Sequence, residues 1–313
     1  MQSGIVSCQR FEQSSLALAR PHPHTLFSMA NGDGKMASAF LDDRGLLRVA
    51  GQDARSFLQG LVTCNMDKVS REQAGFGALL TPQGKILFDF LIVEDEAGFL
   101  LDTDGAQIGA LAKRLAMYRL RAQIAIAEEP ALGILALWDG EAEPAGNPLV
   151  FDDPRDTHMG RRAILDRLQA QAAAKATRSA YDMHRIQCAI PQGGIDFQWN
   201  DIFPHDADMD RIHGLDFRKG CYVGQEVVSR MEHRGALRKR ILPVQLRGDI
   251  PAPGSEILDG DMLIGALGSA AASGRALAMI RTDRAAEAVA GARPLTCAGA
   301  LVDILPEPDM GAR

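Results

Sequence analysis

The clearest pattern of apolar and polar positions is a hairpin formed by residues 75–80 and 85–95. Pro82 and Gly84 lie in the connecting turn, as hairpin turns favour. Both faces of the second arm are apolar except at Asp89, so this strand is predicted to be buried on both sides. Burying a carboxylate costs folding free energy unless a hydrogen bond or an opposite charge compensates for the lost hydration. Two interpretations follow: a carboxylate satisfied by a backbone amide or an arginine, or one held against a bound cofactor.

The rest of the pattern divides the chain into three segments. Residues 1–35 lack sustained periodicity and are expected to be a disordered tail or an extension, with a weak organelle-targeting segment as the alternative. Residues 36–235 combine short strands with periodic helices, which predicts an α+β domain of two lobes. Residues 236–313 contain short apolar runs separated by glycine and proline turns, the pattern of a small β-barrel.

The most distinctive stretch is RKGCYVGQE at residues 218–226. Two glycines flank Cys221, and the run from Val223 onward predicts a helix. A thiol just before a helix N-terminus, with Arg218 and Lys219 beside it, is favoured as thiolate, so Cys221 is the predicted reactive cysteine. The alternative is a glycine-flanked helix entry with a half-buried cysteine.

An irregular stretch at residues 191–217 precedes this motif. It is rich in Gly, Pro, Asp and Asn. Loops of this length inside a compact domain are usually functional. We therefore expect this loop to have a functional role.

Composition narrows the classes of function. The net charge of −6 argues against nonspecific binding to nucleic acid. The five cysteines are scattered, without a CxxC pair or a Cys/His cluster at zinc-site spacing, so no permanently bound metal is predicted. The chain is expected to be cytoplasmic, with the mitochondrial matrix as the alternative if the N-terminal segment is a transit peptide. No apolar run approaches the ~20 residues that a transmembrane helix needs.

The string KGCYVGQE at residues 219–226 resembles the signature of the YgfZ family. These are folate-binding proteins within the aminomethyltransferase (glycine cleavage T-protein) superfamily. Residues 84–89 resemble the aminomethyltransferase segment that ends in two aspartates, with Phe88 at the first position and Asp89 at the second. The DPR and MGRR strings within residues 151–162 resemble the branch of the family linked to iron–sulfur protein maturation. The resemblance covers about residues 36–310.

The resemblance implies an aminomethyltransferase-like fold, with several lobes and antiparallel sheets around a central folate cavity and a C-terminal β-barrel. It implies tetrahydrofolate or a derivative as cofactor, with Asp89 and Cys221 as the catalytic groups, both facing the cavity. The implied folate contacts are Asp89, Tyr118, Arg185, Lys219, Gly220, Tyr222, Gly224, Gln225 and Glu226. On its residue type alone, Tyr118 is expected to pack in the core rather than to stack on a pterin, and Arg185 is equally suited to a structural salt bridge.

Three functions stay open. The first is a folate-dependent assembly or repair factor for iron–sulfur proteins, in which Cys221 is a nucleophile, a redox thiol or a transient cluster ligand. Its implied partners are iron–sulfur apo-proteins or cluster carriers, with no membrane and no direct nucleic acid. The second is a folate-dependent one-carbon transferase such as an aminomethyltransferase, although the glutamate-bearing pterin segment of that enzyme is absent. The third is a tRNA-modification accessory protein, which the charge supports only at residues 234–240.

Overall fold

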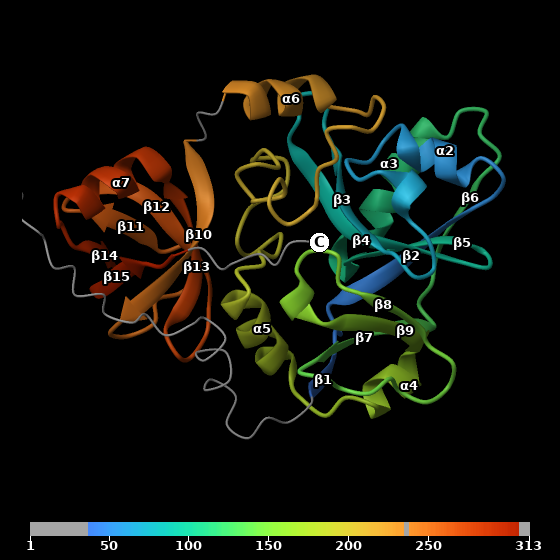
Figure 1. Cartoon of the computed structure of the whole chain (residues 1–313), viewed down its shortest axis with the longest axis horizontal. Coiled ribbons are helices and arrows are strands. Elements are labelled where there is room, and N and C mark those ends of the chain that lie inside the picture. Colours follow the sequence, from blue (N-terminus) through green and yellow to red (C-terminus); the bar gives the residue numbers. More distant parts are fainter. Residues whose placement is uncertain (1–36, 235–237, 307–313) are drawn as a thin grey trace, which may run out of the picture. The chain divides into compact units, whose positions relative to one another are not determined.

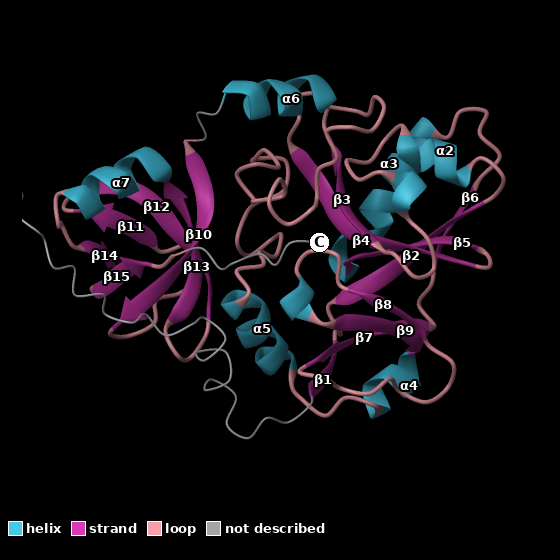
Figure 2. Cartoon of the chain, viewed as in Figure 1, coloured by secondary structure: helices cyan, strands magenta, loops and turns pink. Residues whose placement is uncertain are grey.

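Strands dominate the computed structural model, which describes residues 37–234 and 238–306 (Figure 2). The predicted tail at residues 1–35 lies outside the described residues, as does the predicted domain boundary at residues 235–236. The described strands form two open antiparallel sheets and one closed barrel (Figure 1). This is the predicted α+β class with a C-terminal barrel.

The first sheet has five strands in the order β3-β4-β5-β2-β6. Helices α2 and α3 pack against one of its faces and close an apolar core there. The 3₁₀ turns η1 and η2 lie in its connections. The bounds are β2 Arg44–Ala50, α2 Ala54–Gln59, η1 Met66–Lys68, β3 Gly75–Leu80, β4 Ile86–Asp95, β5 Gly98–Asp104, η2 Gly105–Gln107, α3 Ile108–Tyr118 and β6 Ala125–Glu128.

Strand β4 is the predicted second arm of the hairpin, and it is buried on both faces. Phe88, Phe90 and Ile92 face the helices and belong to their apolar core. Asp89 and Leu91 alternate with them and are also buried, so they point to the opposite face of the sheet. The hairpin turn and the position of Asp89 are therefore as the sequence predicts.

The second sheet has four strands in the order β1-β7-β9-β8. Helix α4 packs on it, and helix α5 follows. Side-chain caps fix where both helices begin, because Asp166 accepts from two amides of α4 and Thr177 from one amide of α5. The bounds are β1 Ala37–Phe40, β7 Leu132–Trp138, β8 Leu149–Asp152, η3 Thr157–Met159, β9 Arg161–Asp166, α4 Arg167–Ala172 and α5 Arg178–Gln187.

The third sheet closes on itself in the order β10-β13-β12-β11-β14-β15, with β15 paired back to β10. Closure leaves no free sheet edge, and helix α7 contributes to the apolar interior. Helix α6 Gln225–Arg234 precedes the barrel. The remaining bounds are β10 Lys239–Arg247, β11 Glu256–Asp259, β12 Met262–Ala270, β13 Arg275–Arg281, α7 Thr282–Ala290, β14 Leu295–Cys297 and β15 Ala300–Ile304.

Gly160 connects η3 to β9 in a conformation that only glycine adopts easily. Its φ is 75°, and a Cβ there would lie 2.2 Å from the carbonyl oxygen of Leu137. We expect Gly160→Ala to lower the free energy of unfolding by about 3 kcal/mol, because backbone strain and a backbone clash add. Urea unfolding measures this loss.

The matched control is Gly140→Ala. Gly140 has a similar φ of 80°, but a Cβ there would meet nothing within 4 Å. Only the strain applies, so the loss should be about 1 kcal/mol. Equal losses in the two variants would contradict the close approach of Gly160 to β7.

Candidate functional site

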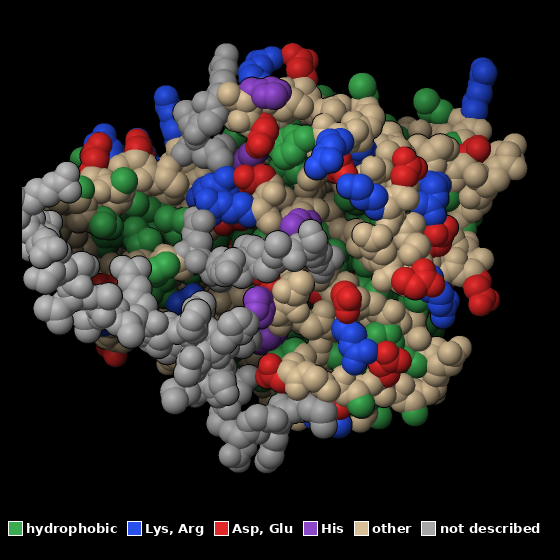
Figure 3. Space-filling view, in the orientation of Figure 1, with side chains coloured by type: hydrophobic (Ala, Val, Ile, Leu, Met, Phe, Trp, Pro, Cys, Tyr) green, Lys and Arg blue, Asp and Glu red, His purple; other side chains and the backbone are tan. Residues whose placement is uncertain are grey.

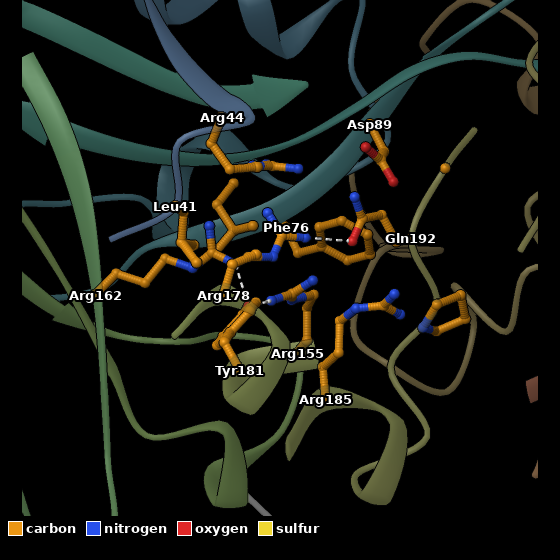
Figure 4. A pocket seen from close by; sticks show the side chains of 13 residues that line it. Leu41, Arg44, Phe76, Asp89, Arg155, Arg162, Arg178, Tyr181, Arg185 and Gln192 are labelled. Carbon is orange, nitrogen blue, oxygen red and sulfur yellow. Dashed lines mark hydrogen bonds between the residues drawn. The ribbon is translucent and has the colours of Figure 1, made fainter. Parts of the chain in front are cut away.

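A small cavity lies at the face of the first sheet that carries Asp89 (Figure 4). Its free volume is about 20 Å³, which is room for about one water molecule. Both open sheets and helix α5 contribute to its walls. The lining residues are Leu41, Arg44, Phe76, Asp89, Leu91, Arg155, Arg162, Arg178, Tyr181, Arg185, Pro191, Gln192 and Gly193.

Asp89 points its carboxylate into this cavity (Figure 4). It is 8% exposed, and none of the described residues donates a hydrogen bond to its carboxylate. Burial raises the pKa of Asp89, and the guanidinium groups of Arg44 and Arg155 offset only part of that effect. Among the described residues, no hydrogen bond from a backbone amide or an arginine satisfies this carboxylate, which favours the interpretation as a carboxylate held for a ligand.

Four charged side chains and a tyrosine form a buried network beside Asp89. Arg155 donates two hydrogen bonds to Asp153, at 2.6 and 2.9 Å, and Arg162 contacts both Asp102 and Asp153. The Tyr181 hydroxyl lies 2.9 Å from Arg162. The DPR and MGRR strings of the sequence thus pair with each other, and Asp102 of β5 joins them to the first sheet.

The network also sets the ionisation of its members. Burial alone would raise the pKa of Asp153, but the charges of Arg155 and Arg162 hold it well below its usual range. Burial likewise opposes ionisation of Tyr181, yet the same two guanidinium groups lower its pKa. Asp89 lies next to this network, and in the part of the chain that the structure describes it has no such hydrogen-bonded partner.

Arg185 lines the cavity and also has a structural role. It donates to Asp182 at 2.8 Å, to Asp196 at 3.1 Å and to the Ser269 hydroxyl of strand β12 at 2.7 Å. Asp196 in turn accepts from the Ser269 amide at 2.6 Å. The salt-bridge interpretation of Arg185 is confirmed, and the bridge ties α5 to the barrel.

Cys221 does not share the cavity with Asp89, so that expectation is wrong. Its side chain is exposed, and it is not among the lining residues. The physical reason is how the loop is anchored. Lys219 and Tyr222 turn inward and are buried, and Gly220 and Cys221 between them stay exposed. Cys64, Cys188 and Cys297 are buried, so Cys221 is the exposed cysteine of the described part of the chain.

Lys219 anchors the signature loop instead of contacting a folate. Its ammonium donates to the backbone carbonyls of Gln59, Val62 and Cys64, at 2.8, 2.6 and 2.8 Å. An ammonium group has three donors, so none is left for a ligand. Burial lowers the pKa of Lys219 to about 8. Its ammonium is thus engaged by these three carbonyls.

The other predicted folate contacts also lie away from the residues that line the cavity. Tyr118 is half-buried and packs against the core of the first sheet, which favours its core-packing interpretation. Gly224 has a φ of 83° and brings the loop against the hairpin turn, since a Cβ there would lie 2.6 Å from the carbonyl oxygen of Thr81. Gln225 begins α6, and Glu226 is exposed and pairs with Arg230 at 2.8 Å.

Sequence reasoning missed most of the charged wall of the cavity. Arg44, Arg155, Arg162 and Tyr181 were not predicted as site residues. The only local signal for Arg162 is its position next to Arg161, directly before the apolar residues 163–165 of a strand. These residues are brought together by segments that are far apart in the sequence. The apolar periodicity of a single segment therefore cannot predict their pairing.

The surface gives no one-signed patch on the face shown in Figure 3. Acidic and basic side chains of the described residues lie next to one another there. Within the described ranges, no helix combines the length and the apolar character needed to cross a membrane.

Comparisons with known proteins agree with this architecture. Residues 238–309 match the family model of the CAF17 C-terminal beta-barrel domain. The crystal structure of glycine cleavage system aminomethyltransferase T from Bartonella henselae superposes with a TM-score of 0.67 at 15% identity, over 86% of this chain and 84% of that one. The similarity confirms the predicted aminomethyltransferase-like fold.

Curated relatives carry one common name. The human iron-sulfur cluster assembly factor IBA57, mitochondrial, is 32% identical over 68% of this chain and 67% of its own length. The mouse protein of that name is 31% identical over 86% and 81%. A homolog from Neurospora crassa is 32% identical, and this chain spans 54% of its length. These names place the relatives in mitochondria, in agreement with the alternative location and not with a cytoplasmic one.

The unpartnered state of Asp89 predicts an unusual pH dependence. A carboxyl whose pKa is raised on folding costs stability once the pH exceeds its ordinary pKa of about 3.9. We expect Asp89→Asn to be more stable than the wild type at neutral pH, with a gain that shrinks as the pH falls toward that value. Urea unfolding at several pH values tests this.

Asp102→Asn provides the contrast, because that carboxylate is buried and paired with Arg44 and Arg162. Removing its charge should lower the free energy of unfolding by about 3 kcal/mol. A loss of stability in Asp89→Asn at neutral pH would mean that Asp89 has a structural partner after all.

Proposed function

The chain belongs to the family of iron–sulfur cluster assembly factors named IBA57, and we propose that it assembles clusters by supplying Cys221 as a ligand. The observation that carries this role is the exposure of the thiol on a loop that is otherwise fixed. Iron–sulfur clusters are held by several ligands, usually four cysteine thiolates. A single exposed thiol therefore requires that a partner protein, a cluster carrier or an apo-protein, supplies the others.

The loop is built to present this one side chain. Lys219 anchors the loop by donating to three backbone carbonyls, and Gly224 allows the loop to pack against the hairpin turn. Gly220 has open space around it, so a partner can approach the thiol closely. Among the described residues none hydrogen-bonds to the Cys221 sulfur, whereas a nucleophilic cysteine would need a base within reach. Of the three roles left open by the sequence, this arrangement favours the transient ligand.

We further propose that the cavity at Asp89 is a folate site, as the resemblance implies. The similar fold and the free, buried carboxylate support it, since a carboxylate can accept hydrogen bonds from the N–H edge of a pterin. The cavity is too small for a folate, because its volume of about 20 Å³ is far below the roughly 300 Å³ of a typical small-molecule pocket. Binding therefore requires the walls to move apart, and we derive no reaction step through folate.

The test of the thiol uses cells depleted of their own factor of this family. The wild-type chain should restore the activity of an iron–sulfur enzyme such as aconitase, and Cys221→Ser should leave it at least tenfold lower. The variant should remain folded, with a free energy of unfolding within about 0.5 kcal/mol of the wild type, since the side chain is exposed.

Cys297→Ala is the matched control. It removes a thiol that is buried in the barrel, so it should restore the enzyme as the wild type does. Full rescue by Cys221→Ser would disprove the ligand role of Cys221.

The folate site is tested separately by calorimetric titration with tetrahydrofolate. The wild type should bind, and Asp89→Asn should bind at least tenfold more weakly, because the accepting carboxylate is lost. Absence of binding to the wild type would refute the folate site without affecting the role of Cys221. Tetrahydrofolate-dependent release of ammonia from an aminomethyl-lipoyl donor would instead identify a one-carbon transferase.

A further inference from the structure

Three potential metal ligands from separate parts of the chain meet beside helix α6. His205 and Asp210 lie in the irregular loop, and Glu232 lies in the last turns of α6. One ligand atom from each lies within 4.8 Å of the other two. Their spacing in the sequence fits no metal motif, so no metal was predicted from it.

The imidazole of His205 is buried without being satisfied. Its exposed fraction is 0%, and its Nε2 lies 3.2 Å from a carboxylate oxygen of Glu232, which is 45% exposed. Its Nδ1 is buried and has no hydrogen-bond partner in the described part of the chain. An orphaned polar atom inside a protein costs free energy. The nitrogen that faces Glu232 is Nε2, so Nε2 is the atom that a metal shared with Glu232 would take.

The loop holds this ring in place by successive turns. The amide of Asp206 donates to the carbonyl of Phe203, and the amide of Met209 donates to that of Pro204. Few conformations are open to such a segment, so the position of the ring is set before any ligand arrives. Preorganised ligands bind a metal with less ordering cost.

Asp210 is oriented by an arginine from the first strand of the barrel. Arg240 donates to its two carboxylate oxygens, at 3.1 and 2.6 Å. Each carboxylate oxygen keeps a free lone pair after one hydrogen bond, so Asp210 can still bind a cation. Carboxylates that ligate metals are commonly held by such hydrogen bonds. With Glu232, the site presents two carboxylates against the one guanidinium.

We propose that His205, Asp210 and Glu232 bind a divalent transition-metal ion such as Zn²⁺, Fe²⁺ or Co²⁺. One imidazole nitrogen and two carboxylate oxygens suit this class, whereas Mg²⁺ and Ca²⁺ prefer oxygen ligands alone. Three protein ligands leave a coordination position for water. The ion would fasten the irregular loop to α6, the helix that begins at Gln225 within the signature. The proposal is independent of cluster assembly by Cys221.

The experiment titrates the full chain with Co²⁺ and then displaces it with Zn²⁺. The chain carries Cys221→Ser, so that the exposed thiol cannot compete. Visible absorption of bound Co²⁺ should saturate at one ion per chain, without the charge-transfer band of a thiolate ligand. Thermal unfolding should shift upward with Zn²⁺, because the ion binds the folded state.

Glu232→Gln is the decisive variant, since this side chain is exposed and the substitution should not prevent folding. It should weaken Co²⁺ binding at least tenfold. His233→Asn is the matched control, as it removes an exposed imidazole from the adjacent position of the same helix and should change binding less than twofold. Asp210→Asn and His205→Asn follow, with circular dichroism to confirm that they fold.

Two results would overturn the proposal. One is the absence of a Co²⁺ spectrum in the chain that carries only Cys221→Ser, at a large excess of metal. The other is binding that Glu232→Gln leaves unchanged, which would place the ion elsewhere in the chain. In either case His205 and Glu232 would form a hydrogen bond only.

Discussion

The pairing of Arg162 with Asp102 is the interaction on which the site depends. Arg162 belongs to the four-stranded sheet and Asp102 to the five-stranded sheet, and both side chains are almost completely buried. Two charges taken out of water are tolerated only when their hydrogen bonds are satisfied by each other and by neighbours. Asp153, Arg155 and Tyr181 are those neighbours. The charged wall of the cavity is thus the contact between the two sheets.

The raised pKa of Asp89 follows from its burial beside this network. The arginines that could have neutralised it are already engaged by Asp102 and Asp153, so its buried carboxylate has no hydrogen-bonded partner among the described residues. Proteins accept such a cost mainly at functional positions. The cavity therefore has the chemistry of a binding site, although its present volume admits only a water molecule.

Local patterns in the sequence were sufficient for the α+β class and the C-terminal barrel, whereas the aminomethyltransferase-like fold was implied by the family resemblance. The apolar run around Asp89 identified a strand buried on both faces, and the glycine and proline turns after residue 240 identified the barrel. The placement of Cys221 and Lys219 was not accessible in this way. Both lie in an irregular loop without periodicity, so nothing in the sequence fixes which side chain turns inward. The meeting of His205 with Glu232 likewise depends on how this loop folds against α6.

The bridge from Arg185 to Ser269 has a consequence for the chain as an evolutionary unit. Asp196 and Arg185 present their charges to a single serine of the barrel, and both are buried by that contact. A chain that ended before the barrel would expose this pair to solvent and lose the serine that completes it. The barrel therefore covers Arg185, a residue of the cavity wall. Gain or loss of this domain during evolution would have required compensating changes in α5.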